Sequence, residues 1–515
     1  MSAEVPDRAT RDVTAAVSPG ATGDAGVPGE APRGPTAGGS PGTSPPGTSL
    51  PTTDVAVVGA GPAGLAAALA AARAGAAVTV VDMGQLPGGQ YLRQPAVAGA
   101  APTRHTGRSG RAARLLRLAT AHPRIRFLVR HQVWQATPDG PATLRLHGPD
   151  GPATLRPRAL VLAPGAHDRV VPFPGWDLPG VVTAGCAQAL VKGHGVLVGR
   201  RVLVAGTGPF LLAVAACLAD AGARVAGVVE ASRMAAWARH PVALATAPAK
   251  LWEAARYLAT LRRHRVPLWE RQAVTEVAEA GDGLRATVRR VDAGWRPGPV
   301  TRTVSVDAVC VGYGFVPSVE LAVALGCATG TDVDGNLVVT VDAFQRSTVP
   351  GVLVAGEATG VGGADLAMAE GEVAGLAAAH HLGLLDARAL ARAAAPAGRR
   401  VARWRRFAAT LHRVHPVPDG WTAWLRDDTV LCRCEEVTAG RIRADVAAYG
   451  VDDLRALKLV TRVGMGLCQG RMCGRAAATL LQQLSGREQP LATVVNRRIV
   501  MPVPLGTVAQ EGARQ

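Results

Sequence analysis

Lysine, aromatic residues and long apolar runs are all scarce in this chain of 515 residues. Only three of its 56 basic residues are lysines, namely Lys192, Lys250 and Lys458, and Phe, Trp and Tyr make up 4% of the sequence. The other basic residues are arginines scattered among apolar residues, without a run of five or more. Nucleic-acid binding requires a basic stripe rather than a high total, so the net charge of +17 does not predict it. A positive surface suits an acidic protein partner better.

The sequence shows neither a signal peptide nor a membrane span. Its N-terminus lacks a basic start, an apolar run and a cleavage motif. The most apolar stretch, residues 55–81, contains Gly59, Pro62 and Arg73, which suit a strand, a loop and a helix better than a bilayer-spanning helix. We therefore expect no membrane span and a cytoplasmic location.

Cysteine is also sparse, but it is unevenly distributed. Four of the eight cysteines occur as Cys432-Arg-Cys434 and Cys468-x4-Cys473, whereas a secreted disulfide framework would spread them through a small domain. We therefore expect a reducing compartment. Two tight thiolate pairs separated by a helical spacer predict a four-sulfur site for a metal or an iron–sulfur cluster. Four thiolates satisfy structural zinc equally well, so the spacing leaves both open.

The charged residues of interest near these cysteines are arginines. Four arginines adjoin the ligands and are predicted either to offset the charge of a cluster or to be solvated: Arg433, Arg462, Arg471 and Arg475. The other four cysteines are isolated in apolar surroundings and are predicted to be small core residues: Cys186, Cys217, Cys310 and Cys327. They form no short reactive pair, so we do not expect a disulfide reductase.

Structure is expected to begin after a disordered tail, because residues 1–52 are almost entirely Gly, Pro, Ala, Ser and Thr and cannot bury apolar area. A strand–helix–strand unit follows at residues 54–59, 62–74 and 77–81. The same order returns as a strand at 201–206, a helix to 221 and a strand at 224–229. The repetition predicts an α/β fold with two nested nucleotide-binding domains. Later strands at 308–311 and 352–355 are expected to return to the first sheet.

The first glycine loop has the complete setting of a dinucleotide-binding site. Gly59 makes the tight turn, Gly61 lets the backbone approach a pyrophosphate, and Gly64 lets the helix pack on the strand. Asp82 ends the second strand, where its carboxylate can accept hydrogen bonds from ribose hydroxyls. The predicted binding residues of this loop are Gly59, Gly61, Pro62, Ala63, Gly64 and Asp82.

The second loop is less complete. Gly206 and Gly208 are present, but Leu211 stands where a small residue belongs. Glu230 ends the next strand, where it would accept from a ribose 2′-hydroxyl and repel a 2′-phosphate. NAD binding at Gly206, Gly208 and Glu230 and an inherited domain without nicotinamide are both open, and NADP is disfavoured.

Three further segments resemble two-dinucleotide-binding flavoproteins. They are Val161-Leu-Ala-Pro-Gly165 with the residues after it, Val352-Leu-Val-Ala-Gly356-Glu357, and Gly88-Gly89-Gln90. The resemblance implies FAD, with the loop at residue 356 near the ribityl chain and the next helix aimed at the flavin. The family usually has Asp where Glu357 stands and Thr where Pro164 stands. The residues implied to hold FAD are Gly88, Gly89, Gln90, Ala163, Gly165, Gly356, Glu357, Ala364 and Asp365.

Between its two cysteine pairs, this chain is predicted to form a helix, a turn and a second helix. The cysteine segment is similar to the [2Fe–2S] domain of bacterioferritin-associated ferredoxins. That family normally has Cys-x2-Cys as its second pair. The Cys-x4-Cys version resembles the FAD/[2Fe–2S] subunits of heteromeric amine dehydrogenases, such as opine oxidases, hydroxyproline dehydrogenases and hydrogen cyanide synthase. The resemblance covers about residues 53–510.

This resemblance implies an electron relay from a catalytic, amine-oxidising flavoprotein subunit, often with a small ferredoxin-like subunit. We find no catalytic constellation, because His167, His194, His412 and His415 are isolated histidines of the kind that is usually structural. Two alternatives remain, an NADH-dependent flavin reductase that passes electrons to the cluster and a non-redox zinc-binding module.

The domain boundaries that we predict are these: tail 1–52, FAD-binding domain 53–195 and 313–385, second dinucleotide-binding-like domain 196–312, helical linker 386–428, small mainly helical [2Fe–2S] domain 429–490, and extension 491–515.

Overall fold

The structure is a computed structural model that describes residues 50, 52–95 and 110–512. The predicted tail lies almost entirely outside these residues. Among the described residues, the first sheet has five strands, all parallel, in the order β20-β7-β1-β2-β3. Its strands are β1 (Thr53–Val58), β2 (Val78–Val81), β3 (Ile125–Leu128), β7 (Pro157–Leu162) and β20 (Val352–Val354).

The first strand–helix–strand unit has the expected form. Helix α1 (Pro62–Arg73) begins with a proline, whose missing N–H costs nothing in the first turn. Gly75, at φ +105°, ends it and turns the chain into β2. Strands β1 and β2 are in parallel register, with Val55 opposite Val78.

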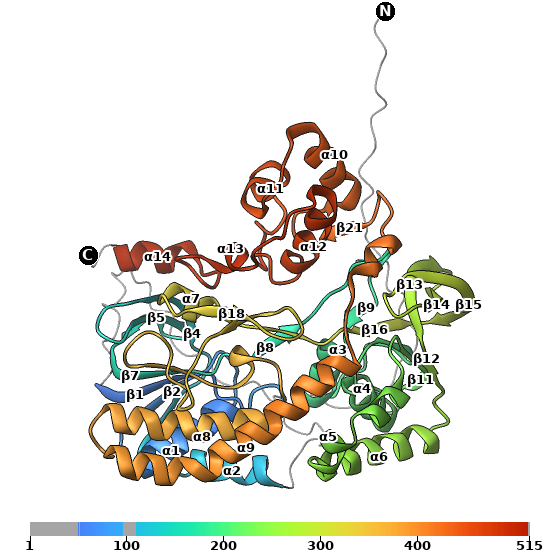
Figure 1. The fold of residues 1–515 in the computed structure, drawn as a ribbon. Coiled ribbons are helices and arrows are strands. Elements are labelled where there is room, and N and C mark those ends of the chain that lie inside the picture. Colours follow the sequence, from blue (N-terminus) through green and yellow to red (C-terminus); the bar gives the residue numbers. More distant parts are fainter. Residues whose placement is uncertain (1–49, 51, 96–109, 513–515) are drawn as a thin grey trace, which may run out of the picture. The chain divides into compact units, whose positions relative to one another are not determined.

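Two long helices complete the first unit. Helix α8 (Ala364–His381) lies beside α1, and helix α9 (Ala387–Val414) follows and packs on α8 (Figure 1). The contact between α1 and α8 depends on glycine, because a Cβ on Gly371 would lie 2.0 Å from the carbonyl oxygen of Ala63. Close helix packing therefore holds the start of α1 in place.

The second sheet is also parallel and five-stranded within the described residues, in the order β12-β11-β10-β16-β9. Its elements are β9 (Val181–Thr183), β10 (Arg201–Gly206), α4 (Phe210–Asp220), β11 (Arg224–Glu230), α6 (Pro248–Arg263), β12 (Leu268–Glu270) and β16 (Ala308–Gly312). The prediction for the two later strands is half right. Strand β20 joins the first sheet, but β16 pairs with β10, with Val202 opposite Ala308.

An antiparallel sheet explains this correction. Strands β13 (Gln272–Ala280), β14 (Gly283–Val291) and β15 (Pro297–Val306) form a meander that leads the chain directly back to the second sheet. The chain then leaves through a two-stranded ribbon, in which β17 (Phe315–Pro317) pairs with β8 (Ala166–Asp168).

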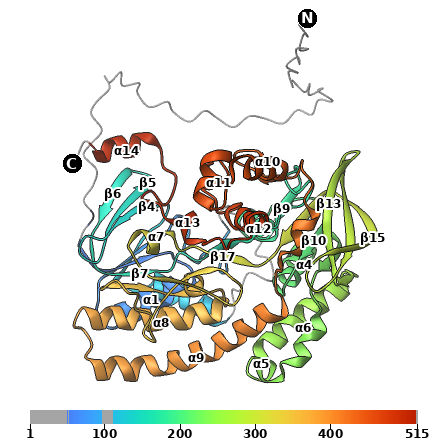
Figure 2. The same ribbon diagram turned by 45° about the horizontal axis from the view of Figure 1, so that its top comes forward.

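The C-terminal part is small and mainly helical (Figure 2). It contains β21 (Val430–Cys432), β22 (Val437–Thr438), α10 (Ala439–Tyr449), α11 (Leu454–Thr461) and α12 (Gly474–Ser485). Thr438 and Asp453 cap α10 and α11 through their side chains. Its apolar core is continuous with that of the antiparallel meander, and the indole N–H of Trp176 donates to the carbonyl of Val430 at 2.5 Å.

None of the helices in the described part of the chain combines the length and the apolar composition needed to cross a membrane.

Candidate functional site

The first glycine loop has the shape of a phosphate cradle. A Cβ on Gly59 would lie 2.2 Å from the carbonyl oxygen of Ala163, and one on Gly64 would lie 1.8 Å from that of Gly59. A Cβ on Gly61, in contrast, would meet nothing within 4 Å. No side chain caps the first turn of α1, so its N–H groups are not taken by a capping residue. Two glycines are thus required by packing, whereas Gly61 faces open space where an anion can approach.

The other predicted FAD loops gather at this point. A Cβ on Gly89 would lie 2.8 Å from the Cα of Gly61, and the N–H of Gly88 donates to the carbonyl of Ala60 at 2.9 Å. A Cβ on Gly356 would lie 2.8 Å from the Cβ of Ala63. Segments from four separate parts of the sequence therefore surround the start of α1, as a bound dinucleotide requires, and these residues fit FAD.

Asp82 lies at the end of β2, but its carboxylate is partly engaged by the backbone. It accepts hydrogen bonds from the N–H of Ala60 at 2.6 Å and the N–H of Gly84 at 2.7 Å. Asp82 thus shapes the loop, and its role toward a ribose stays a prediction.

Glu357 departs from the family pattern, and its side chain turns back on its own loop. Its carboxylate accepts from the N–H of Gly363 at 2.9 Å and of Gly362 at 3.2 Å. Burial raises the pKa of Glu357 to about 7. The carboxylate is engaged by its own loop, and the predicted contact between Glu357 and FAD remains a prediction.

The loop at Gly356 is held by a residue that the sequence did not single out. The fully buried carboxylate of Glu370 on α8 accepts from the N–H of Gly356 and from the hydroxyl of Thr359, each at 2.9 Å. Arg405 of α9 lies 2.5 Å from Glu370 and donates to the carbonyl of Thr359 at 2.6 Å. The sequence feature that could have identified Glu370 is its position as a charged residue within a helix of mostly small apolar residues.

Two of the remaining predicted FAD residues begin α8, which contacts the second dinucleotide-binding unit. Gln90 is exposed and accepts from Arg93 at 2.6 Å. Ala364 is buried in the first turn of α8, and its neighbour Asp365 lies 3.2 Å from the Nζ of Lys250 on α6. Lys250 thus joins the second unit to the predicted flavin loops. The only feature of the sequence that drew attention to Lys250 was the scarcity of lysine.

The second glycine loop is closed by its own residues. A Cβ on Gly206 would lie 1.8 Å from the carbonyl oxygen of Gly312, whereas one on Gly208 would meet nothing within 4 Å. Glu230 is 2% exposed, and it accepts from the hydroxyl of Thr207 and the N–H of Gly208, each at 2.8 Å. Leu211 is buried in the core of this unit. Both carboxylate oxygens of Glu230 are therefore engaged internally.

The four predicted cluster ligands come together. Cys432 ends β21, Cys473 precedes α12, and the thiol of Cys473 contacts those of Cys432 and Cys468, while Cys434 contacts Cys468. In the described residues no three His, Cys, Asp or Glu side chains are arranged to hold a single metal ion. Cys432 and Cys473 are buried, and Cys434 is exposed.

The surroundings favour the thiolate form for two of these four thiols. Contact with the Cys473 thiol lowers the pKa of Cys432 to about 6 and of Cys468 to about 5, whereas burial raises the pKa of Cys434 and the contacts with Cys432 and Cys468 raise that of Cys473. Backbone N–H groups, including that of Gly464, also donate to Cys432. Because cysteine binds iron as a thiolate, this donor set fits a [2Fe–2S] cluster.

Three of the four arginines near these ligands contact the rest of the protein. Arg433 donates to the carbonyl of Trp176 at 2.5 Å, and Arg475 donates to the side chain of Asn336. Arg471 lies 2.7 Å from Glu320. Arg462 instead pairs at 2.8 Å with Glu435 within the small domain.

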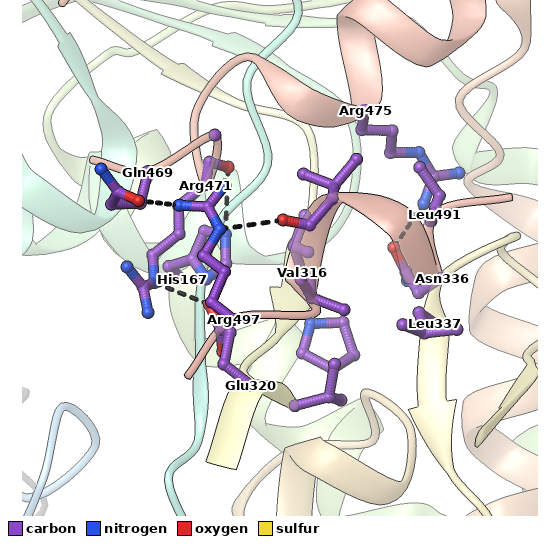
Figure 3. A pocket seen from close by; sticks show the side chains of 15 residues that line it. His167, Val316, Glu320, Asn336, Leu337, Gln469, Arg471, Arg475, Leu491 and Arg497 are labelled. Carbon is purple, nitrogen blue, oxygen red and sulfur yellow. Dashed lines mark hydrogen bonds and ion pairs between the residues drawn. The ribbon is translucent and has the colours of Figure 1, made fainter. Parts of the chain in front are cut away.

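Figure 3 shows the junction around Arg471 and Arg475, where there is a partly open cavity of about 50 Å³. His167 of β8 lies in its wall, and the Nε2–H of His167 donates to the carbonyl of Arg471 at 3.1 Å. Burial lowers the pKa of His167, and its Nδ1 is buried without a hydrogen-bond partner among the described residues. The neutral Nε2–H tautomer is therefore the one present.

The prediction for the isolated cysteines is right for three of them. Cys217, Cys310 and Cys327 are buried, but Cys186 is exposed. Cys186 lies in the first turn of α3 (Ala184–His194), where Thr183 caps the helix by accepting from its N–H. The apolar sequence around it did not reveal that this turn faces solvent.

Comparison with known proteins defines the class of the molecule. The family model described as "Pyridine nucleotide-disulphide oxidoreductase" matches residues 53–375, and the model described as "BFD-like [2Fe-2S] binding domain" matches residues 430–483. The chain belongs to the pyridine nucleotide-disulphide oxidoreductase family, as a flavin oxidoreductase with FAD and a [2Fe–2S] cluster. The predicted α/β fold with a C-terminal helical cluster domain is thereby confirmed.

The relatives are more specific. Hydrogen cyanide synthase subunit HcnB of Pseudomonas aeruginosa is 35% identical over 441 residues, covering 84% of this chain and 93% of that protein. An opine oxidase subunit of Rhizobium meliloti is 34% identical over 475 residues, covering 88% and 98%. These matches confirm the predicted resemblance. The solved L-proline dehydrogenase from P. horikoshii shares the fold, with a TM-score of 0.59 over 89% of this chain and 79% of that one, at 19% identity.

Proposed function

We propose that this chain is the electron-transfer subunit of a heteromeric amine dehydrogenase, and that it relays electrons from a partner flavoprotein subunit. Its relatives are named as subunits of hydrogen cyanide synthase and opine oxidase, which supports a partner. In the proposed reaction an amine or imino acid loses two electrons and two protons as a C–H and an N–H bond break and a C=N bond forms. A one-electron acceptor, such as a small ferredoxin-like protein, then takes the two electrons singly.

The observation that carries the proposal is the contact between His167 and Arg471. His167 lies two residues after Gly165 of a predicted flavin loop, and Arg471 lies between the cluster ligands Cys468 and Cys473. When bound, FAD accepts electrons in pairs and a [2Fe–2S] cluster carries one, so the two groups together convert pair transfer into single-electron transfer. The residues of this chain bind both groups, exclude water from the buried thiols and hold the two loops together.

The proposal is tested on the purified full-length protein. We expect a yellow-brown protein with FAD and about two irons and two sulfides per chain. Stepwise anaerobic reduction with dithionite should bleach the flavin and produce the paramagnetic signal of a reduced [2Fe–2S] cluster. Zinc without iron would refute the proposal and favour the non-redox module. A further arm adds an amine-oxidising flavoprotein subunit, with its amine, in place of dithionite; no reduction of this chain would refute the relay.

A further inference from the structure

The loop between Cys468 and Cys473 is two residues longer than the usual pair of its family, and Arg471 lies in it. The side chain of Arg471 reaches Glu320, the first residue of α7 (Glu320–Ala324) (Figure 3). Its Nε lies 2.7 Å from Oε1 of Glu320, and both side chains are mostly buried. The longer loop therefore carries a charged contact to a distant part of the chain.

Every nitrogen of this guanidinium has a partner. The two terminal nitrogens donate to the carbonyl of Val500 at 2.7 Å and to that of Cys468 at 3.4 Å, and Nε faces Glu320. A buried ion pair adds little net stability, because desolvation offsets the attraction, but it favours one geometry strongly. Arg471 is thus held in one position.

One partner of the loop lies in a two-stranded ribbon and the other follows the same ribbon shortly after its end. His167 of β8 lies opposite Val316 of β17 in the antiparallel register, and Glu320 follows β17 closely. Strand β8 begins immediately after Gly165, in the predicted flavin loop. The side chain of Arg471 and its backbone carbonyl therefore attach the cluster-ligand loop to the ribbon that continues from the flavin loop.

We propose that Arg471, Glu320 and His167 form a positioning device that holds the cluster-ligand loop on the flavin-bearing ribbon and thereby sets the rate of electron transfer between the two groups. This inference rests on the proposed function and deepens it. Each transfer moves one electron from the flavin side to the cluster without making or breaking a bond, and two transfers with loss of the associated protons return the flavin side to its oxidised state. Electron tunnelling falls steeply with distance, so a small displacement of this loop lowers the rate.

The experiment uses the full-length protein loaded with FAD and cluster. Arg471→Gln and Glu320→Gln each remove one charge of the pair, and the double variant Glu320→Arg/Arg471→Glu reverses it. Arg462→Gln is the matched control, because it removes a charge beside the same ligands from the solvent-facing pair with Glu435. Arg487→Gln breaks an exposed pair with Asp452 in the same small domain.

Flash photoreduction of the flavin, followed at the absorption of the cluster, measures the transfer rate. We expect about a tenfold loss in Arg471→Gln and in Glu320→Gln, equivalent to about 1.4 kcal/mol, with partial recovery in the reversed pair. Arg462→Gln should shift the cluster potential as Arg471→Gln does but leave the rate within about twofold. Full rates in both single variants, with intact cofactor content, would overturn the inference.

Amide hydrogen exchange of the same proteins separates this inference from the proposed function. We expect faster exchange in the 468–473 loop of Arg471→Gln and Glu320→Gln than in Arg487→Gln. Unchanged exchange would show that the pair does not hold the loop, whatever the transfer rates are. The loop can exchange faster in the variants while the unaltered protein passes no electron to its cluster. In that case the proposed relay is wrong, and so is the role of this pair in electron transfer.

Discussion

The Nδ1 of His415 lies 3.6 Å from Oε1 of Glu230, at the point where α9 ends against the second glycine loop. The Nε2 of His415 accepts from the indole N–H of Trp237 at 3.1 Å, so the ring is held there. The residue that the sequence assigns to a ribose is therefore surrounded by protein on this side. This arrangement argues against the NADH-dependent alternative.

We accordingly expect NADH to reduce the bound flavin poorly. Anaerobic mixing with millimolar NADH, followed by the visible absorption of FAD, should show no bleaching on the timescale of turnover with the amine partner. Dithionite serves as the control that the flavin is reducible. Rapid bleaching by NADH would restore the alternative of a self-sufficient reductase.

The glycines of the first loop offer a matched pair of substitutions. Gly61→Ala should fold normally, because Gly61 has φ −73° and its Cβ would meet no protein atom within 4 Å, but it should bind FAD at least about tenfold more weakly. Gly64→Ala should lower the free energy of unfolding by about 1–3 kcal/mol, because its Cβ would strike the carbonyl of Gly59. Flavin fluorescence titration and urea unfolding measure the two effects. Equal FAD affinity in Gly61→Ala and the unaltered protein would contradict the prediction that the pyrophosphate binds at this loop.

Serine substitutions test the ligand set of the cluster. Replacement of Cys432, Cys434, Cys468 or Cys473 should abolish or strongly reduce the iron and sulfide content, because a hydroxyl replaces a thiolate ligand. Cys186→Ser is the control, since Cys186 is exposed and lies outside this group. Iron and sulfide analysis gives the result, and full cluster content in any of the four variants would exclude that cysteine as a ligand.

Lys250→Met should weaken FAD binding by about tenfold, or about 1.4 kcal/mol, because Asp365 at the start of α8 loses its cationic partner and the second unit loses a contact with the flavin loops. Arg263→Met is the control, because Arg263 lies on the same helix and pairs with Asp220 at an exposed site. Flavin titration of both apoproteins measures the difference. Similar affinities would make the Lys250 pair irrelevant to FAD.

Glu357 predicts a pH dependence of stability. Its folded-state pKa of about 7 is raised above the usual 4.5, so the folded protein binds the proton more tightly than the unfolded chain. The contribution of Glu357 is full below about pH 4.5 and is lost as the pH rises through 7, with a slope of at most about 1.4 kcal/mol per pH unit. Glu357→Gln should reduce this slope. Urea unfolding at several pH values measures it, and identical slopes in both proteins would contradict the assignment.

The sequence by itself determined the local chemistry. The packing roles of Gly59 and Gly64 follow from a short spacing after a strand, and the prediction of four cluster cysteines follows from two close pairs. Such motifs can be recognised from the sequence because the residues that form one turn or one ligand pair are close neighbours in the chain. The backbone conformation that they require extends over only a few residues. The class of the protein could be predicted for the same reason.

Only the tertiary structure decided how these local sites are connected. It placed β16 in the second sheet, engaged Glu230 with its own loop, and joined Arg471 to Glu320. These outcomes depend on the pairing of distant strands and on burial, which sets whether a carboxylate meets water, a backbone N–H or an arginine. A residue's type limits the bonds that its side chain can make, but its surroundings in the folded chain select the bonds that form.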